Sequence, residues 1–299
     1  MVERIGHRGA RGLFPENTIA GFRLAAPLVD RIELDIGLTA DDVVVVSHDP
    51  APNPNFSRDP DGAWLTGKSP LLRQLTAIQL ARLDVGRIRP GSPYAALFPD
   101  QSPIDGARVP TLADVLAALP TMPFTLELKT FPEQPDRTAS PAHMAERVLA
   151  EIQSANASAR ITVQSFDWRG PRHLRSRPRP DYRLSWAWLT SPATIAAAAL
   201  WWDGPTPMDF GGSVARAVAA VGGAGDTWSP WFEDLTPDQI AEAHGLNLRV
   251  VPWTVNRRQD IDRLIGWGVD GIITDRPDRF PVNPNRSSEP ESSPAPRPG

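Results

Sequence analysis

Short runs of apolar and β-branched residues alternate along the chain with longer amphipathic stretches. This alternation predicts repeated βα units and therefore a parallel sheet covered by helices. Eight of the runs have strand character, at residues 3–7, 30–38, 124–128, 161–164, 183–187, 226–229, 248–254 and 271–274. Eight such strands predict one α/β domain, a TIM (β/α)8 barrel that spans residues 1–280.

The stretches between these runs carry helix signals. Candidate helices lie at 18–25, 111–119, 141–153, 191–202, in a stretch that opens at 236, and at 257–267. Thr18 and Thr236 are suitable N-cap residues, because a hydroxyl oxygen can accept a free backbone N–H of the first turn. Gly268 follows the last candidate helix, where glycine often ends a helix. These signals support helices between the strands.

Residues 43–47 form one further apolar run, which does not fit a barrel strand. Only Thr39-Ala40-Asp41-Asp42 separates it from the preceding run, and a parallel crossover needs about a dozen residues. The two runs must therefore form an antiparallel hairpin. A turn centred between residues 41 and 42 places position 48 opposite position 35. The hairpin thus predicts that His48 folds back beside Asp35.

Two segments depart from the βα pattern. Residues 50–110 are rich in Pro, Gly, Asp and Arg, and they predict an insertion on one face of the barrel with one helix at 75–83. Trp64, Tyr94 and Phe98 give this insertion aromatic groups to pack, which favours an ordered segment. Residues 281–299 have almost no apolar side chains, and they predict a disordered Pro/Ser-rich tail.

Composition excludes several classes of protein and site. Of the 299 residues, 41% are hydrophobic, which is enough for a sizeable core. The formal net charge of −4 argues against a nucleic-acid-binding surface. The chain has no cysteine, so disulfides, thiolate ligands and a cysteine nucleophile are excluded. No run approaches the ~20 apolar residues of a membrane span, and no signal peptide is evident, so we expect a cytoplasmic location.

Acidic side chains and a histidine mark the ends of three predicted strands. His7 ends the first strand, and Glu127 lies near the end of the third. Glu33 and Asp35 are two residues apart on the second strand, so they share one face. In a barrel, the active site lies where the strands end. Oxygen ligands from these three acids suit one hard divalent cation, Ca²⁺ or Mg²⁺.

Two histidines and two cationic side chains add the other groups that a reaction at a phosphate requires. Imidazole titrates near neutral pH, so His7 and His48 can divide the work of general base and general acid. A divalent cation stabilises the charge that builds on phosphorus, and Arg8 and Lys129 add positive charge for the phosphate. The residues alone leave open which histidine is the base, which metal binds, and the oligomeric state.

Simpler interpretations of some of these residues also stay open. Arg8 can bind one of the acids in place of a phosphate. Glu127 and Lys129 can form an ion pair without a metal. Asn17 is a candidate site contact, but it can also cap the first helix together with Glu16.

The same segments resemble the glycerophosphodiester phosphodiesterase family. Its motifs recur here in the family's order, from the first predicted strand to residue 277. They are HRG at 7–9, PENT at 15–18, E-x-D at 33–35, HD at 48–49, E-x-K at 127–129, TVN at 254–256 and GVDGIITD-x-P at 268–277. One departure is the family's T-K-D-G turn, which reads Thr39-Ala40-Asp41-Asp42 here. The missing lysine and glycine affect the turn and none of the candidate ligands.

The resemblance implies a TIM barrel of the phospholipase C-like phosphodiesterase type, which hydrolyses glycerophosphodiesters to glycerol 3-phosphate and an alcohol. It implies a divalent metal held by Glu33, Asp35 and Glu127, with the two histidines as acid and base. The glycerol hydroxyl of the substrate would attack phosphorus and give a cyclic phosphate that water opens. It also implies that Trp253 packs against the glycerol carbons and that the segment after His48 is the family's insertion. We therefore expect a small-molecule partner.

Two other functions remain as alternatives. A phospholipase D-like member of the same superfamily would act on lysophospholipid or sphingomyelin, and it would need an apolar trough for an acyl chain. A non-catalytic barrel that binds phosphoesters as a sensor or scaffold would be expected to lack a histidine or a metal ligand. Every expected group is present in this chain, which ranks the second alternative lower.

Overall fold

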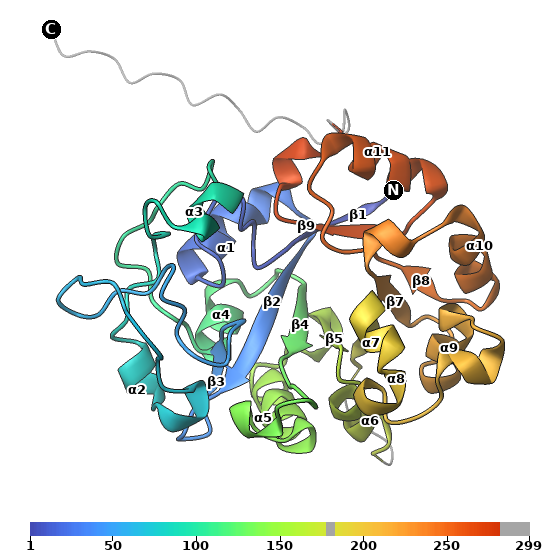
Figure 1. Ribbon diagram of the computed structural model, residues 1–299, viewed down its shortest axis with the longest axis horizontal. Helices are drawn as coiled ribbons and strands as arrows, with labels where there is room; N and C mark the ends of the chain where they lie inside the picture. The colour runs from blue at the N-terminus through green and yellow to red at the C-terminus, as the bar shows by residue number, and fades with distance from the viewer. Residues whose placement is uncertain (178–182, 282–299) are drawn as a thin grey trace, which may run out of the picture.

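The computed structural model describes residues 1–177 and 183–281 (Figure 1). Its central sheet has the strand order β8-β7-β6-β5-β4-β2-β1-β9, with β3 paired to β2. The strands are β1 (Glu3–Gly6), β2 (Arg31–Leu38), β3 (Val44–Val46), β4 (Phe124–Leu128), β5 (Ile161–Ser165), β6 (Ser185–Thr190), β7 (Thr227–Pro230), β8 (Arg249–Val250) and β9 (Gly271–Thr274).

Helices surround this sheet on the outside, as Figure 1 shows. They are α1 (Ile19–Ala25), α2 (Ala77–Leu80), α3 (Pro93–Leu97), α4 (Leu112–Ala118), α5 (Pro141–Ser154), α6 (Arg169–Arg175), α7 (Pro192–Ala196), α8 (Ala198–Trp201), α9 (Val214–Val221), α10 (Pro237–Gly245) and α11 (Arg258–Trp267). Within the described residues, no helix is both long enough and apolar enough to cross a bilayer.

The sheet curves round until its two edges meet. Each neighbouring pair along the barrel is parallel, and β1 lies between β2 and β9. At the remaining edge, the Asp270 N–H donates to the Val250 carbonyl at 2.9 Å, and the Ile273 N–H donates to the Pro252 carbonyl at 3.0 Å. These bonds join β9 to the segment that contains β8. The predicted TIM (β/α)8 barrel is confirmed.

Alternation along β2 separates the core from the candidate site. Ile32, Leu34 and Ile36 are fully buried and belong to the large hydrophobic cluster between strands and helices. Glu33 and Asp35 lie between them on the opposite face of the strand, because successive side chains point to opposite sides. Both sides of the strand are buried. The barrel interior therefore contains acids at positions where aliphatic side chains would give a more stable core.

The hairpin of β2 and β3 is antiparallel, as expected, but its predicted register is wrong by one residue. Ile36 pairs with Val46, and the Ser47 N–H donates to the Asp35 carbonyl at 2.9 Å, so position 47 is opposite position 35. The turn centres on residue 41 because Asp42 adopts a left-handed φ of 58°. Such a three-residue loop is a common hairpin connection.

Residues 50–110 lie beside α1 on one side of the barrel (Figure 1). The helix expected at 75–83 is shorter and forms α2 alone. Tyr94 packs against Phe98 and Phe56, with ring centroids 5.0 and 5.7 Å apart. Trp64 instead packs under the Arg58 guanidinium at 5.5 Å. Of the tail expected at 281–299, all but residue 281 lies outside the described residues.

Candidate active site

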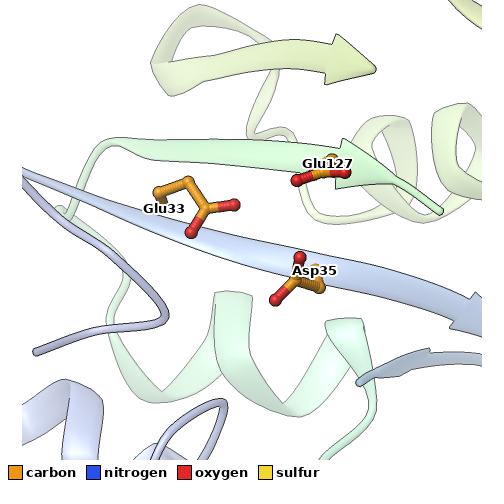
Figure 2. A group of neighbouring side chains, drawn as sticks. All are labelled: Glu33, Asp35 and Glu127. Atoms are coloured by element: carbon orange, nitrogen blue, oxygen red, sulfur yellow. The ribbon is translucent and has the colours of Figure 1, made fainter. Parts of the chain in front are cut away.

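Three carboxylates from adjacent strands meet inside the barrel, as Figure 2 shows. Glu33 and Asp35 come from β2 and Glu127 from β4, where Asp35 and Glu127 are register partners. All three residues are buried, and each offers a carboxylate oxygen within 4.8 Å of the others. The structure therefore brings together the three acids that the strand pattern singled out.

The surrounding residues shift the pKa values of Glu33 and Asp35 in opposite directions. Burial, together with repulsion from Asp35 and Glu127, raises the pKa of Glu33 well above its ordinary value. Burial acts in the same direction on Asp35, but Arg8 and other cationic groups outweigh it and hold the pKa of Asp35 well below its usual range. A buried cluster with such mutual repulsion is stabilised by any cation that enters it.

One acceptor in the cluster lacks a hydrogen bond. Among the described residues, Asp35 Oδ1 is buried and has no hydrogen-bond partner, and the nearest cation, Lys129 Nζ, lies 3.6 Å away. Buried polar atoms without a partner are rare in folded proteins. Carboxylate oxygens are also the ligands that Mg²⁺ and Ca²⁺ prefer. The residues present therefore fit a hard divalent cation.

Lys129 forms the ion pair that the sequence left open. Its Nζ lies 2.6 Å from Glu127 Oε1. Burial lowers the pKa of Lys129, but the charges of Glu127 and Asp35 outweigh burial and raise it above the ordinary value. The ammonium group therefore stays charged at the edge of the acid cluster.

Arg8 contacts acids through both its backbone and its side chain. It has a left-handed φ of 50°, and its N–H donates to Glu33 Oε2 at 3.0 Å. Its Nη1 donates to Glu16 Oε1 at 2.7 Å, and its Nε lies 3.1 Å from Asp35 Oδ2. Arg8 therefore binds acids, as one interpretation of the sequence allowed. Its backbone contacts Glu33, while Glu16 and Asp35 hold its guanidinium.

Asn17 is a contact of the acid cluster and does not cap α1. Its Nδ2 donates to Asp35 Oδ2 at 2.9 Å. The cap is Thr18, as expected, because Thr18 Oγ1 accepts from the Gly21 N–H at 3.0 Å. Asn17 therefore orients a candidate metal ligand.

His7 has a different partner at each ring nitrogen. Nδ1 lies 2.7 Å from Asp275 Oδ1, and Nε2 lies 3.9 Å from Glu33 Oε2. Burial lowers the pKa of His7 to about 4, while His7 and Arg11 hold the pKa of Asp275 well below its usual range despite burial. An ionised carboxylate only accepts hydrogen bonds, so the proton of the neutral ring sits on Nδ1. Nε2 is then free to accept a proton.

Asp275, which is not among the site residues predicted from the sequence, organises this corner of the site. Arg11 Nε donates to its Oδ1 at 3.0 Å, and Asn256 Nδ2 donates to its Oδ2 at 2.8 Å. Asp275 directly follows β9 and ends the GVDGIITD motif. Its place at a strand end was the available signal.

His48 lies two residues after β3 and is about one third exposed. Its Nδ1 lies 2.8 Å from Asp49 Oδ1, and Asp49 Oδ2 accepts from Asn53 Nδ2 at 2.6 Å. His48 therefore has its own carboxylate partner, as His7 does.

Both histidines line one cavity of about 340 Å³. The cavity also exposes Glu33, Glu127 and Lys129. One side of it is aromatic, since Trp253 lies 5.1 Å from Phe166 and 5.0 Å from Trp231 between ring centroids. Arg8 and Trp253 line this cavity as well, whereas Asp35 and Asn17 are not among its lining residues.

Known proteins are similar to this chain in sequence and in fold. The sequence profile described as "Glycerophosphoryl diester phosphodiesterase family" matches residues 7–279. The chain belongs to this family. The resemblance inferred from the motifs is therefore confirmed, and with it the expected enzyme class, a glycerophosphodiester phosphodiesterase.

Three relatives that match over more than 90% of their lengths illustrate the similarity. A glycerophosphodiester phosphodiesterase from Caldanaerobacter subterraneus subsp. tengcongensis is 27% identical over 278 residues, 92% of this chain and 94% of the relative. A crystal structure from Silicibacter pomeroyi DSS-3, assigned to the same enzyme class, is 37% identical with a TM-score of 0.82, and the match covers 93% of this chain and 91% of that one. An Oleispira antarctica phosphodiesterase in complex with the product sn-glycerol-3-phosphate shares the fold, with a TM-score of 0.66, 18% identity and coverage of 93% and 94%.

Proposed function

We propose that this family member hydrolyses glycerophosphodiesters to glycerol 3-phosphate and an alcohol, using a divalent metal and two histidines. The observation that carries the proposal is the single cavity that places His7 and His48 beside the buried acid cluster. Acid, base and charge stabilisation are the three requirements of phosphodiester cleavage, and this cavity has a candidate for each.

Glu33, Asp35 and Glu127 would hold the metal, Mg²⁺ or Ca²⁺. The unpartnered oxygen of Asp35 and the repulsion within the cluster support this assignment. When bound, the ion would neutralise the phosphate and stabilise the charge that develops on phosphorus. Arg8 and Asn17 would keep Asp35 in place through their contacts with its Oδ2.

His7 would be the general base. Its ring is neutral, Asp275 fixes its Nδ1 proton, and Nε2 can take the proton of the attacking glycerol hydroxyl. As that oxygen bonds to phosphorus, the bond from phosphorus to the alcohol oxygen breaks. His48 would donate a proton to this leaving oxygen, and Asp49 would steady its ring. Water then opens the cyclic phosphate, with the two roles reversed.

Lys129 and Trp253 would bind the substrate. The Lys129 ammonium lines the cavity beside Glu127 and can contact a phosphate oxygen. Trp253 presents a flat apolar surface that suits the glycerol carbons. Its ring is held by a hydrogen bond from Nε1 to the Ser229 carbonyl at 3.0 Å.

Hydrolysis of glycerophosphocholine, followed as release of glycerol 3-phosphate with Mg²⁺, Ca²⁺ or EDTA, tests the proposal. His7→Ala and His48→Ala are each expected to lose ~10²–10⁴-fold in kcat. His143→Ala is the matched control, because His143 is exposed and pairs with Asp42 away from the cavity. Full activity in either site variant would contradict the assigned roles. Much faster turnover of lysophosphatidylcholine would favour the phospholipase D-like alternative.

A further inference from the structure

A second cavity, of about 630 Å³, lies against Asp49. Residues 49–54, 67–69, 71 and 74 of the insertion line it, together with Gln134 and Arg137 from the loop after β4. We refer to it as the insertion cavity. Arg73 joins these two parts of its wall, because its Nη1 donates to the Asp136 carbonyl at 2.8 Å.

The insertion cavity adjoins the active-site cavity at His48. A small space of about 10 Å³ has His48 and Lys129 in common with the active-site cavity, and Asp49 and Arg137 in common with the insertion cavity. Asp49 also joins them chemically, since its two oxygens contact His48 and Asn53. The histidine proposed to protonate the leaving alcohol therefore lies between the two cavities.

The wall of the insertion cavity is cationic. Lys68 makes no hydrogen bond or ion pair in the described part of the chain. Arg137 donates to the amide oxygen of Gln134 at 3.1 Å and lies 5.8 Å from the Phe131 ring, with no carboxylate partner among the described residues. The one acid of the wall, Asp49, is already bonded to His48 and Asn53. Two cations are thus left to attract an anion.

The other lining groups are amides, a hydroxyl, prolines and aliphatic side chains, with no aromatic ring among them. Aromatic faces are what proteins use to bind quaternary ammonium groups such as choline. Charge-assisted hydrogen bonds from lysine and arginine are what they use for phosphate. The chemistry of this wall therefore favours an anionic head group over a cationic one.

We propose that the insertion cavity binds the alcohol portion of the diester and selects head groups that carry an anionic group, such as a phosphorylated polyol. This rests on the proposed function, because it places the leaving oxygen beside His48. Lys68 and Arg137 bind the anionic group, and the glycerol portion lies along the aromatic side of the active-site cavity.

A matched pair of substrates tests the proposal: glycerophosphoinositol and glycerophosphoinositol 4-phosphate, which differ by one phosphate. The wild-type chain is expected to show a roughly tenfold higher kcat/KM for the phosphorylated substrate. Lys68→Ala/Arg137→Ala is expected to abolish this preference, by lowering kcat/KM for the phosphorylated substrate to the value for glycerophosphoinositol. Equal kcat/KM values in the wild-type chain, or a preference that survives in the double variant, would overturn the proposal.

Arg216→Ala/Arg258→Ala is the control for net charge. It also removes two cations, from exposed positions on α9 and α11 that pair with Glu242 and Asp262. This variant is expected to keep the wild-type preference. Loss of the preference here would attribute it to overall charge and overturn the role of the cavity.

Calorimetric titration with inositol 4-phosphate separates this proposal from the proposed function, since it needs no turnover. The Kd is expected to rise at least about tenfold in Lys68→Ala/Arg137→Ala. If the Kd rises in this way but the wild-type chain hydrolyses no diester, the proposed function would be refuted and the binding cavity supported. Equal binding by both chains, or binding by neither, would overturn the cavity as an anion site.

Discussion

His7 shows how a buried position and one carboxylate prepare an imidazole for proton transfer. Burial lowers its pKa to about 4, whereas a histidine in an unfolded chain titrates near ~6.5. Between these values, the unfolded chain binds a proton that the folded chain does not. The stability tied to His7 is therefore complete above the unfolded pKa and is lost as pH falls towards the folded one.

This difference predicts the stability of a His7→Gln variant. In metal-free buffer, lowering the pH from 7 to 5 should cost the wild-type chain about 2 kcal/mol through His7 alone. Glutamine does not titrate and can still donate to Asp275, so the variant should lose about 2 kcal/mol less over the same interval. Denaturant unfolding of both chains at the two pH values measures this difference. Parallel pH profiles would show that His7 is not buried as a neutral ring.

Asp275 predicts a second effect at the scale of one residue. Asp275→Asn removes the negative charge that holds the Nδ1 proton of His7, so the neutral ring is free to adopt the other tautomer. We expect kcat to fall at least ~10²-fold, by analogy with the loss of an orienting carboxylate behind a catalytic histidine, and KM to change little. Steady-state kinetics of hydrolysis give both constants. An unchanged kcat would show that Asp275 is purely structural.

Individual site residues differ in how far the sequence could reveal them. Glu33 and Asp35 were predictable because two acids at strand spacing interrupt an apolar run. Asp275 has a strand-end position as its signal, but its contact with His7 was not predictable, because it joins residues 268 positions apart. Glu16 likewise reads as a helix-terminus residue until the structure shows Arg8 and Tyr94 bonded to it. Contacts between distant segments carry no local pattern.

At the scale of elements, helix α3 of the insertion connects to the acid cluster through side chains. The Tyr94 hydroxyl donates to Glu16 Oε2. Glu16 accepts from Arg8, and Arg8 in turn lies beside Asp35. The insertion therefore contributes to the position of a candidate metal ligand, in addition to forming the second cavity.

Tyr94→Phe removes the hydroxyl of this connection and keeps the ring. The loss of a buried hydrogen bond to a charged group should cost about 1–3 kcal/mol of stability. We also expect a higher metal concentration for half-maximal activity, because Arg8 and Asp35 become less well fixed. Phe56→Leu is the control, since Phe56 packs on the Tyr94 ring without reaching Glu16. A wild-type metal requirement in Tyr94→Phe would contradict this link.

The type of each helix and strand was more predictable from the sequence than its exact bounds or register. The antiparallel hairpin followed from the short connection after residue 38, but its register depended on the left-handed backbone of Asp42. The helix expected at 191–202 is divided into α7 and α8 at Ala197, and Trp202 then stacks on Trp168 at 4.1 Å. Turn conformation and tertiary packing decide such details, and the alternation of polar and apolar residues does not report them.

At the scale of the whole molecule, a divalent cation bound to the three buried acids would add to the stability of the folded barrel. A ligand that binds only the folded state at 100 times its Kd adds about 2.7 kcal/mol of stability. For a chain of this size, each kcal/mol raises Tm by about 2–4 °C. Divalent metal is therefore expected to raise Tm by several degrees.

Differential scanning calorimetry with EDTA, Mg²⁺ and Ca²⁺ measures this shift. Glu127→Gln should show a smaller shift because it removes one negative ligand from the cluster. Glu146→Gln is the matched control, since Glu146 pairs with His173 outside the cavity. An identical Tm of the wild-type chain with EDTA and with both metals would contradict a metal site at Glu33, Asp35 and Glu127.

The barrel as a whole was predictable because a short apolar run in the sequence indicates each strand. Its strand order follows the chain, apart from β3, so no unusual connection had to be guessed. Closure could not be read directly, since the β8 segment is held to β9 mainly by backbone bonds that have no side-chain signature.

Because β1 pairs with β9, the order of synthesis on the ribosome also determines when the chain can become active. His7 is synthesised 268 residues before Asp275, which emerges only after the rest of the barrel has been made. Until then, the Nδ1 proton of His7 has no carboxylate to hold it, even if Glu33, Asp35 and Glu127 are already in place. Any product that stops before residue 275 should therefore have much lower activity than the full chain, however much of the barrel it contains.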